Sequence, residues 1–260
     1  MQLSMTSYGV RLTNLADRLQ WIRYIPLTLH LYIGDNELIP NSLKQLIDSV
    51  NNLKLHIVPD YKSLKKSYFA LQDFPNEDIF LLDDDWIYTP NWIMYSIDNY
   101  INHKQFFQNC VVGLIGYKVI KNNTGDFEFM MYGDAQNDFQ KSLNCISGHC
   151  QPLNPSFKNV ILSGGPGSWL NSNQVHSDYF NIELYNKLCG GTHDEIWNWI
   201  QSVRVGQKHV SLSTIRCLPC CVENQLGPKL GEINTCDTSN IYFKNILSEY
   251  PDIRCLLEIS

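Results

Sequence analysis

Three consecutive aspartates, Asp83, Asp84 and Asp85, are the residues of this chain best suited to chemistry. They follow directly on the unbroken apolar run at residues 79–82. A short apolar run of this kind is typical of a strand buried on both faces of a parallel sheet. Adjacent carboxylates repel one another and cannot all leave water without a counter-charge. Because Mg²⁺ and Mn²⁺ prefer oxygen ligands, the triplet predicts a divalent-metal site, with a solvated acidic turn as the alternative.

Predicted strands and predicted helices alternate along the sequence around the triplet. Apolar patterns predict strands and helices in turn over the first 115 residues: strands at 2–8, 27–33, 53–58, 78–83 and 111–115, and helices at 12–22, 40–50, 63–71 and 90–101. This alternation predicts an α/β fold, a mainly parallel central sheet with helices on both faces. The triplet then lies at the carboxyl ends of the strands, where such folds bind ligands.

The sequence changes character after residue 120. Residues 121–155 are rich in Asn, Gly, Asp, Gln and Ser, which predicts strands and long loops. A strand at 160–162 leads to Gly164 and Gly165, where backbone without side chains can approach a ligand closely. Their spacing fits neither a phosphate-binding Walker loop nor a dinucleotide fingerprint. Trp169 lies beside these glycines.

A second group of polar residues precedes a predicted amphipathic helix. Thr192 and Glu195 have the spacing of a capping box, which explains Glu195 structurally. It does not explain Asp194, which falls in the first turn beside the positive end of the helix. The apolar face of this helix consists of Ile196, Trp199, Ile200 and Val203. A late strand is predicted to begin at His209.

Composition limits the classes of function. The chain has 260 residues, of which 44% are hydrophobic, enough for a packed core. A net charge of −6 argues against non-specific nucleic-acid binding. Nine cysteines suggest reduced thiols, and Cys217, Cys220 and Cys221 lack the second pair that a zinc site needs. No apolar run of membrane-spanning length occurs, so we expect a soluble, cytoplasmic protein with at most peripheral membrane association.

Five segments, in this order, resemble GT-A-fold glycosyltransferases, especially bacterial enzymes of capsule and lipopolysaccharide synthesis and related viral ones. They are residues 4–8 with Arg11, 62–66, 80–88, 164–165 and 193–197. The resemblance covers residues 3–215. It implies a GT-A-like fold and metal-dependent transfer of a sugar from a nucleotide sugar to a carbohydrate or glycoconjugate hydroxyl, with inversion. UDP is the commonest nucleotide among such metal-dependent enzymes.

The resemblance also implies roles for individual residues. Asp85 and Asp83 would bind Mn²⁺ or Mg²⁺, Asp83 would also contact the nucleoside, and Asp84 would assist or face the sugar. His209 would be an additional metal ligand, unless it is an ordinary core histidine. The other implied donor contacts are Thr6, Tyr8, Arg11, Lys62, Lys66, Gly164, Gly165 and Trp169. Trp169 is the best candidate for an apolar platform under a sugar ring.

On the acceptor side, the resemblance implies Asp194 as the general base, with Glu195 as its substitute. It divides the chain into a donor-binding half at residues 1–120, an acceptor-binding and catalytic half at 121–215 and a C-terminal appendage at 216–260.

Two other classes of function stay open at this point. One is a non-catalytic protein that binds nucleotides or carbohydrates. The other is a phosphohydrolase with Asp83 as nucleophile and Asp85 as acid. That pattern normally has a Thr where Ile87 stands, and it normally lies near the chain start, so it is the weaker alternative.

Overall fold

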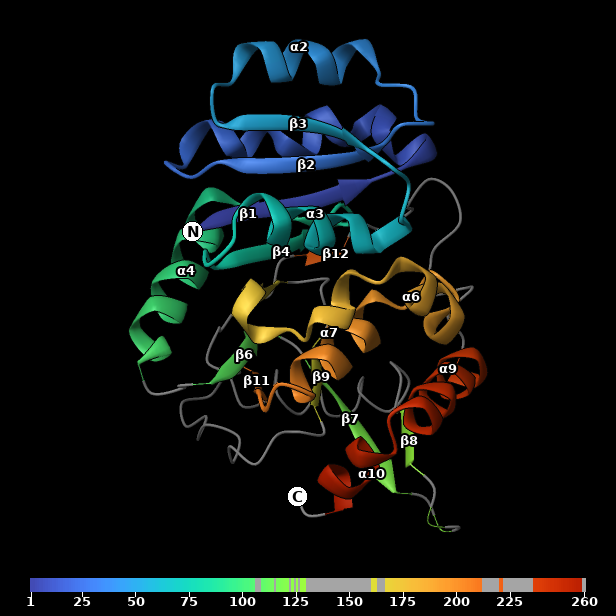
Figure 1. Ribbon diagram of the computed structural model, residues 1–260. Coiled ribbons are helices and arrows are strands. Elements are labelled where there is room, and N and C mark those ends of the chain that lie inside the picture. Colours follow the sequence, from blue (N-terminus) through green and yellow to red (C-terminus); the bar gives the residue numbers. More distant parts are fainter. Residues whose placement is uncertain are drawn as a thin grey trace. The chain divides into compact units, whose positions relative to one another are not determined.

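The computed structural model describes residues 1–105, 109–114, 116–121, 123, 125, 127–129, 160–162, 167–211, 220–221 and 236–258. The chain divides into two compact units (Figure 1). The first unit comprises Met1–Gln108, Gly164–Asn173 and Cys217–Lys229. The second comprises Asn109–Ser163, Gln174–Arg216 and Leu230–Ser260. The functional division expected near residues 120 and 215 stays a prediction.

The first unit is built on a mainly parallel sheet. Its strands are β1 (Gln2–Ser7), β2 (Leu29–Gly34), β3 (Leu53–Val58), β4 (Ile79–Asp83) and β10 (Ser168–Leu170), in the order β10-β4-β1-β2-β3. Strand β1 runs parallel to β2 and β4, and β2 runs parallel to β3. Only β10 among these strands is antiparallel, to β4. The predicted α/β architecture with a mainly parallel sheet is therefore confirmed.

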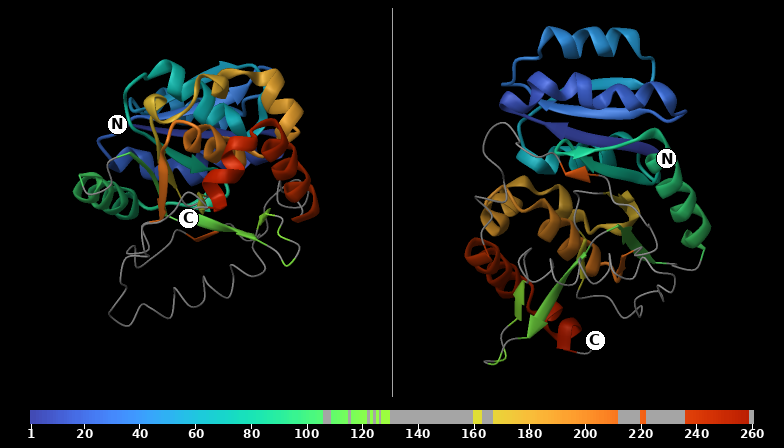
Figure 2. Two further views of the ribbon diagram at one scale, coloured as in Figure 1. Left: turned by 60° about the horizontal axis from the view of Figure 1, so that its bottom comes forward. Right: turned by 180° about the vertical axis from the view of Figure 1, so that it is seen from behind.

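Helices cover both faces of this sheet. On one face α3 (Lys65–Asp73), which follows the short 3-10 turn η3 (Lys62–Leu64), contacts β1, β2 and β4. Figure 1 shows it in front of the sheet, whereas the rear view in Figure 2 brings the helical residues 9–24 to the front. Two further helices are α2 (Asn41–Ser49) and α4 (Pro90–Lys104). Thr89 caps α4 as expected, because the Trp92 N–H donates to its hydroxyl at 3.2 Å.

The helix predicted at residues 12–22 is interrupted. It consists of a 3-10 turn η1 (Gly9–Asn14), one α-turn α1 (Leu15–Arg18) and a second 3-10 turn η2 (Leu19–Tyr24). The apolar residues that suggested it, Leu12, Leu15, Leu19 and Ile22, are all buried. Spacings of three and four residues suit both helix types, so the pattern located the buried face without fixing the hydrogen bonding.

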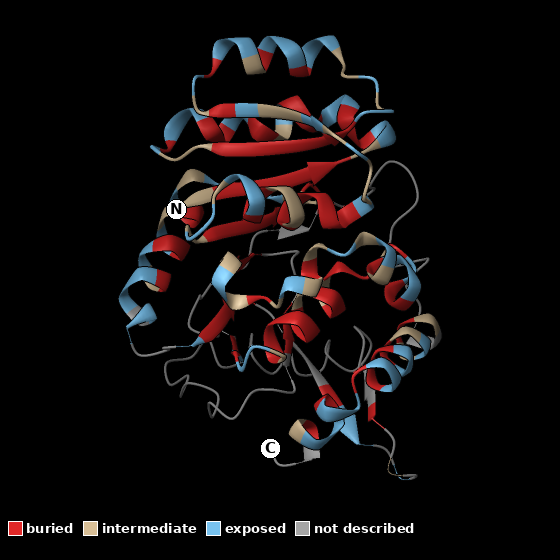
Figure 3. Cartoon of the chain, viewed as in Figure 1, coloured by how far each residue is buried: buried red, intermediate tan, exposed pale blue. Residues whose placement is uncertain are grey.

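The sheet residues that lead to the triplet are buried from solvent, as Figure 3 shows for β1, β2 and β4. All four apolar residues of β4 are at most 1% exposed. The outer strand β3 is mixed in exposure, as expected for an edge. Beyond the triplet, β5 (Trp86–Ile87) pairs antiparallel with β12 (Cys220–Cys221). The triplet is thus anchored from both sides along the chain.

The second unit contains a parallel pair and an antiparallel ribbon. Strand β6 (Cys110–Gly113) pairs with β11 (Lys208–Ser211) in parallel. Strand β7 (Gly116–Lys121) pairs antiparallel with β8 (Phe127–Phe129) and with β9 (Val160–Leu162). The 3-10 turn η5 (Ser172–Gln174) lies where the chain passes from the first unit to the second.

The helical elements of the second unit are η6 (Ser177–Phe180), α6 (Ile182–Cys189), α7 (Asp194–Val203), α9 (Cys236–Glu249) and α10 (Pro251–Glu258). Residues 240–247, which the sequence left between helix and strand, are helical. Helix α9 contacts α6 and β8, and its Phe243 and Ile246 are fully buried. The helices of the C-terminal segment therefore belong to the core of this unit. Among the described helices, none is long and apolar enough to span a membrane.

Candidate functional site

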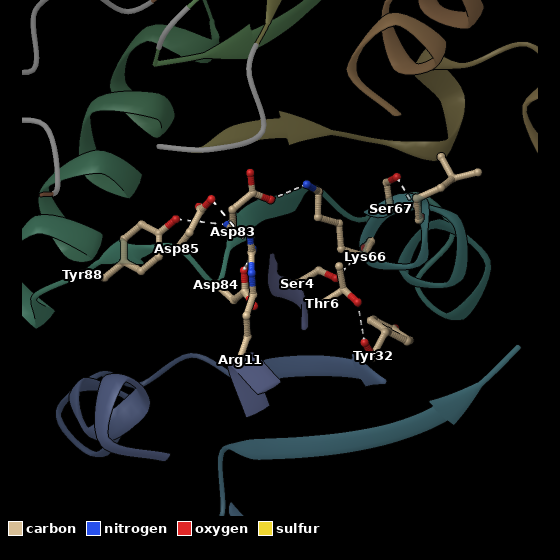
Figure 4. Close-up of polar contacts among 11 residues, drawn as sticks. Ser4, Thr6, Arg11, Tyr32, Lys66, Ser67, Asp83, Asp84, Asp85 and Tyr88 are labelled. Carbon is tan, nitrogen blue, oxygen red and sulfur yellow. Dashed lines mark hydrogen bonds and ion pairs between the residues drawn. The ribbon is translucent and has the colours of Figure 1, made fainter. Parts of the chain in front are cut away.

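The triplet lies at the carboxyl edge of two neighbouring parallel strands. Thr6 of β1 is the register partner of Asp83, the last residue of β4. Asp84 and Asp85 follow in the turn that leaves the strand. Because parallel strands end at the same edge, side chains that follow β1 can reach this turn, as Arg11 does in Figure 4.

Asp84 is the buried member of the triplet, with 5% of its surface exposed. Arg11 donates to Asp84 Oδ1 at 2.8 Å, and the Ser7 hydroxyl donates to Oδ2. Arg18 donates to the Asp84 carbonyl oxygen at 2.8 Å, so the backbone of the turn is held as well. Burial raises the pKa of Asp84, and Arg11 and Ser7 oppose that rise. Both carboxylate oxygens of Asp84 thus accept hydrogen bonds from the protein, and its role toward a ligand stays a prediction.

Asp83 is engaged from two sides. Its carboxylate forms an ion pair with Lys66, whose side chain reaches it from the first turn of α3 and is only 3% exposed. Its backbone N–H donates to the phenol oxygen of the buried Tyr88 at 3.1 Å. Because Asp83 itself keeps 26% of its side chain exposed, the pair with Lys66 is open to an incoming ligand.

Asp85 has a looser environment. Its Oδ2 lies 3.9 Å from the Arg11 guanidinium, and 27% of its side chain is exposed. Arg11 also lies over the Tyr8 ring, 4.8 Å from the ring centre, in a cation–π contact. Burial would lower the pKa of Arg11, but the carboxylate of Asp84 raises it, so the guanidinium stays charged.

The carboxylates of the triplet fit a metal ion that is shared with a ligand, and do not form a closed cage. Within the part of the chain that the structure describes, no three His, Cys, Asp or Glu side chains group into a ready-made metal site. Asp84 is committed to Arg11 and Ser7, whereas Asp85 and Asp83 each keep about a quarter of the side chain exposed. Mg²⁺ commonly binds in this way, through one or two carboxylates, substrate phosphates and water. Asp85 and Asp83 are the residues that would hold it.

Three predicted donor contacts have other partners. The Thr6 hydroxyl donates to the Tyr32 carbonyl at 2.7 Å and braces β1 against β2. Lys62 is exposed, and its ammonium lies 4.0 Å from Asp60 Oδ2. Trp169, expected as a sugar platform, is 1% exposed and is stacked on both faces. The rings of Phe80 and Tyr100 lie 4.2 and 4.6 Å from it, so the platform prediction is wrong.

His209 is a core residue of the second unit. It is 1% exposed, and its Nε2 lies 2.9 Å from the Ser202 hydroxyl of α7. Burial lowers its pKa to about 3. This is the ordinary core histidine that the sequence kept as the alternative, and we assign it no metal-binding role. Gly164, Gly165 and Cys217 lie outside the described residues.

Asp194 and Glu195 begin helix α7 in the second unit. Asp194 is 5% exposed and Glu195 is half-buried. The N-cap residue is His193, not Thr192, and the His193 side chain makes no capping bond, so the predicted capping box with Thr192 as N-cap is wrong. The imidazole instead lies between two hydroxyls, Thr192 Oγ1 at 3.0 Å and Ser239 Oγ at 3.1 Å. The structure places these residues at a helix start, as predicted, and their catalytic roles stay a proposal.

Sequence reasoning missed three residues that hold the triplet: Ser7, Arg18 and Tyr88. Arg18 lies seven residues after Arg11, a spacing that would share one face of the predicted continuous helix, but the segment folds as separate 3-10 and α turns. Ser7 ends the first strand, one residue beyond the predicted contact Thr6. The Tyr88 hydroxyl had no recognisable signal, because its partner is a backbone N–H five residues earlier.

Comparisons with known proteins add little. No protein-family model matches the chain, and the search of curated proteins finds no significant relative. One similar solved structure is CMP:2-keto-3-deoxy-manno-octonic acid synthetase complexed with CTP. The match has a TM-score of 0.41 and 10% sequence identity, and it covers 81% of this chain and 88% of that chain. Identity and TM-score are too low for this similarity to inform the activity of the chain.

Proposed function

We propose that this protein is a glycosyltransferase that binds a nucleotide-sugar donor at the carboxyl edge of β1 and β4. The single observation that carries the proposal is the arrangement at that edge. Two protein cations, Arg11 and Lys66, contact an acidic turn whose outer carboxylates stay partly exposed. Such a site offers positive charge and metal-binding oxygens together, as a diphosphate requires. A UDP-sugar is the first donor to test, from the resemblance to metal-dependent GT-A enzymes.

The donor side of the reaction needs charge stabilisation. Cleavage of the bond between the anomeric carbon and the diphosphate oxygen leaves negative charge on the diphosphate. The Lys66 ammonium is paired with Asp83, and the Lys66 side chain is only 3% exposed. Because it is already held at the site, it can stabilise the negative charge of the diphosphate with little rearrangement. A bound Mn²⁺ or Mg²⁺ would add Lewis-acid stabilisation of the same leaving group. Asp84 holds the Arg11 guanidinium in place, 3.9 Å from Asp85 Oδ2.

The acceptor side needs a base. Asp194, in the first turn of α7, is proposed to take the proton of an acceptor hydroxyl, with Glu195 as its substitute. The acceptor oxygen then bonds to the anomeric carbon while the carbon–diphosphate bond breaks. Attack opposite the leaving diphosphate inverts the anomeric centre. A product that retains the donor configuration would reject this single displacement.

The test is release of nucleoside diphosphate from a panel of nucleotide sugars, with and without Mn²⁺. A glycosyltransferase should release it slowly even without acceptor, and faster with a suitable carbohydrate or glycoconjugate. Asp85→Asn should abolish the Mn²⁺-dependent part of donor binding, measured by calorimetry. The matched control is Asp17→Asn, which changes an exposed aspartate of the same unit and should leave binding unchanged.

Two outcomes would contradict the glycosyltransferase proposal, and a third would remove only its metal assignment. Donor binding without any release identifies a non-catalytic binding protein. Phosphate release from simple phosphomonoesters identifies a phosphohydrolase. Wild-type donor affinity of Asp85→Asn in Mn²⁺ removes the metal assignment.

A further inference from the structure

We infer that the C-terminal helix α9 is a positioning element for the proposed base, acting through a contact between Ser239 and His193. This inference rests on the proposed function, because it concerns the same Asp194. It assigns a role to a segment that the sequence analysis treated as an appendage. Ser239 is a positioning residue and has no proposed contact with substrate.

The contact is buried and defined in geometry. Ser239 is 1% exposed and His193 is 5% exposed. The Ser239 hydroxyl lies 3.1 Å from His193 Nε2, and the Thr192 hydroxyl lies 3.0 Å from Nδ1. Burial lowers the pKa of His193, so the imidazole is neutral and has one donor and one acceptor nitrogen. Two hydroxyls, each able to donate or accept, are partners of these nitrogens, and a hydrogen bond to the Cys189 backbone is a third polar contact of the ring.

The loop before α7 is shaped directly on α9. The His193 ring lies 4.8 Å from the Tyr242 ring, one helical turn from Ser239. Gly190 has a φ of 60°, and a Cβ there would overlap the Tyr242 hydroxyl. Only glycine meets both conditions, the left-handed backbone and the close approach. Helix α9 therefore fixes the chain on both sides of residues 191 and 192.

This arrangement determines where α7 starts. His193 is the N-cap residue but caps no backbone N–H with its side chain, so its ring is free to be held by α9 instead. Asp194 is the next residue and is itself buried. A base must lie within hydrogen-bond reach of its proton, and small displacements reduce the rate steeply. Loss of the Ser239 contact should therefore affect proton transfer more than donor binding.

The deciding variant is Ser239→Ala, with Ser248→Ala as the matched control on the exposed face of the same helix. We expect Ser239→Ala to lower kcat for sugar transfer about tenfold, the scale of one lost hydrogen bond, at unchanged donor KM. Amide hydrogen exchange at residues 193–197 should become faster. Ser248→Ala should match the wild type in both measurements. His193→Asn provides a second variant with the same expected direction.

Exchange and kinetics separate the two levels of the argument. Unchanged exchange at residues 193–197 in both Ser239→Ala and His193→Asn overturns the positioning role, whatever the activity. Faster exchange together with a raised donor KM and an unchanged kcat also overturns it, because donor binding would then be the affected step. Near-normal turnover of Asp194→Asn, together with faster exchange in Ser239→Ala, instead refutes the base assignment and leaves the structural contact intact.

Discussion

Two groups of buried titratable residues, one in each unit, have partners of opposite kinds. In the first unit, buried Asp84 is paired with the guanidinium of Arg11, and Asp83 is paired with Lys66. In the second unit, buried His193 and His209 are held by neutral hydroxyls, those of Ser239 and Ser202 among them. The first arrangement keeps charges in place, whereas the second keeps imidazoles uncharged.

This difference separates two kinds of site. Paired charges at a strand edge can be redistributed when an anion arrives, because a diphosphate competes with the carboxylates for the same cations. Neutral hydrogen bonds fix geometry without attracting ions. The first unit is therefore suited to binding a charged donor, and the second to holding a helix start in one position. Each arrangement has its own vulnerability, which a variant can expose.

The largest effect is expected from removing the buried cation of the first unit. Arg11→Met leaves Asp84 buried without its ion-pair partner, and the remaining Ser7 bond cannot neutralise it. Breaking a buried pair in this way costs about 3–5 kcal/mol. We expect that loss in the free energy of unfolding, measured by denaturant titration at neutral pH.

Arg23→Met is the control for this variant, because Arg23 is exposed and donates to Gln20 and Ser49 at the surface. It should change the free energy of unfolding by less than about 0.5 kcal/mol. If Arg11→Met is no less stable than this control, Asp84 does not depend on its cation, and the contrast between the units is wrong.

The second unit should instead be sensitive to acid. The pKa of His209 is about 3 in the folded protein, below its ordinary value of 6.5, so the unfolded chain takes up the proton first as pH falls. Its contribution is fully present above pH 6.5 and is lost as pH falls toward 3. Between pH 6.5 and 5, His209 alone should cost the protein about 1.5 kcal/mol of unfolding free energy. His209→Gln should remove that share of the pH dependence.

Denaturant titrations of both proteins at pH 6.5 and 5 measure this difference. Burial also lowers the pKa of His30 and His56 in the first unit, so some pH dependence should persist in His209→Gln. Ser202→Ala is the control, because it removes the hydroxyl beside His209 but leaves the imidazole buried, and it should keep the wild-type slope. Equal slopes for wild type and His209→Gln would show that His209 is not held neutral.

The sequence predicted the strand edge and its acidic turn because both depend on short-range signals. An apolar run followed by charges marks a buried strand and its end, and residues 79–85 carry both signals. The cations Arg11 and Lys66 were also among the predicted contacts. Which cation meets which carboxylate was not predictable, since that depends on how η1 and α3 lie against the sheet.

The predictions that failed, and the contact that was missed, depend on residues distant from one another in the sequence. Trp169 was placed by its neighbouring glycines, but its surroundings come from Phe80 of β4 and Tyr100 of α4, distant in the sequence. The contact of Ser239 with His193 spans 46 residues and has no periodic signature. Local patterns predict elements, and they do not predict which elements pack together.

The smallest effect is expected from replacing a lysine of the first unit, and it compares the buried Lys66 with the exposed Lys62. Lys66 contacts Asp83 and is 3% exposed, whereas Lys62 is 60% exposed and lies beside Asp60. If the edge binds a diphosphate, Lys66→Met should weaken binding of UDP about tenfold, or about 1.4 kcal/mol. Lys62→Met, the same chemical change three to four residues away, should leave the affinity within twofold. Calorimetric titration with UDP in Mn²⁺ compares them directly. Equal losses of affinity in both variants would mean that the two lysines act only through their contribution to the net positive charge near the site. The ion pair between Lys66 and Asp83 would then have no specific role in donor binding.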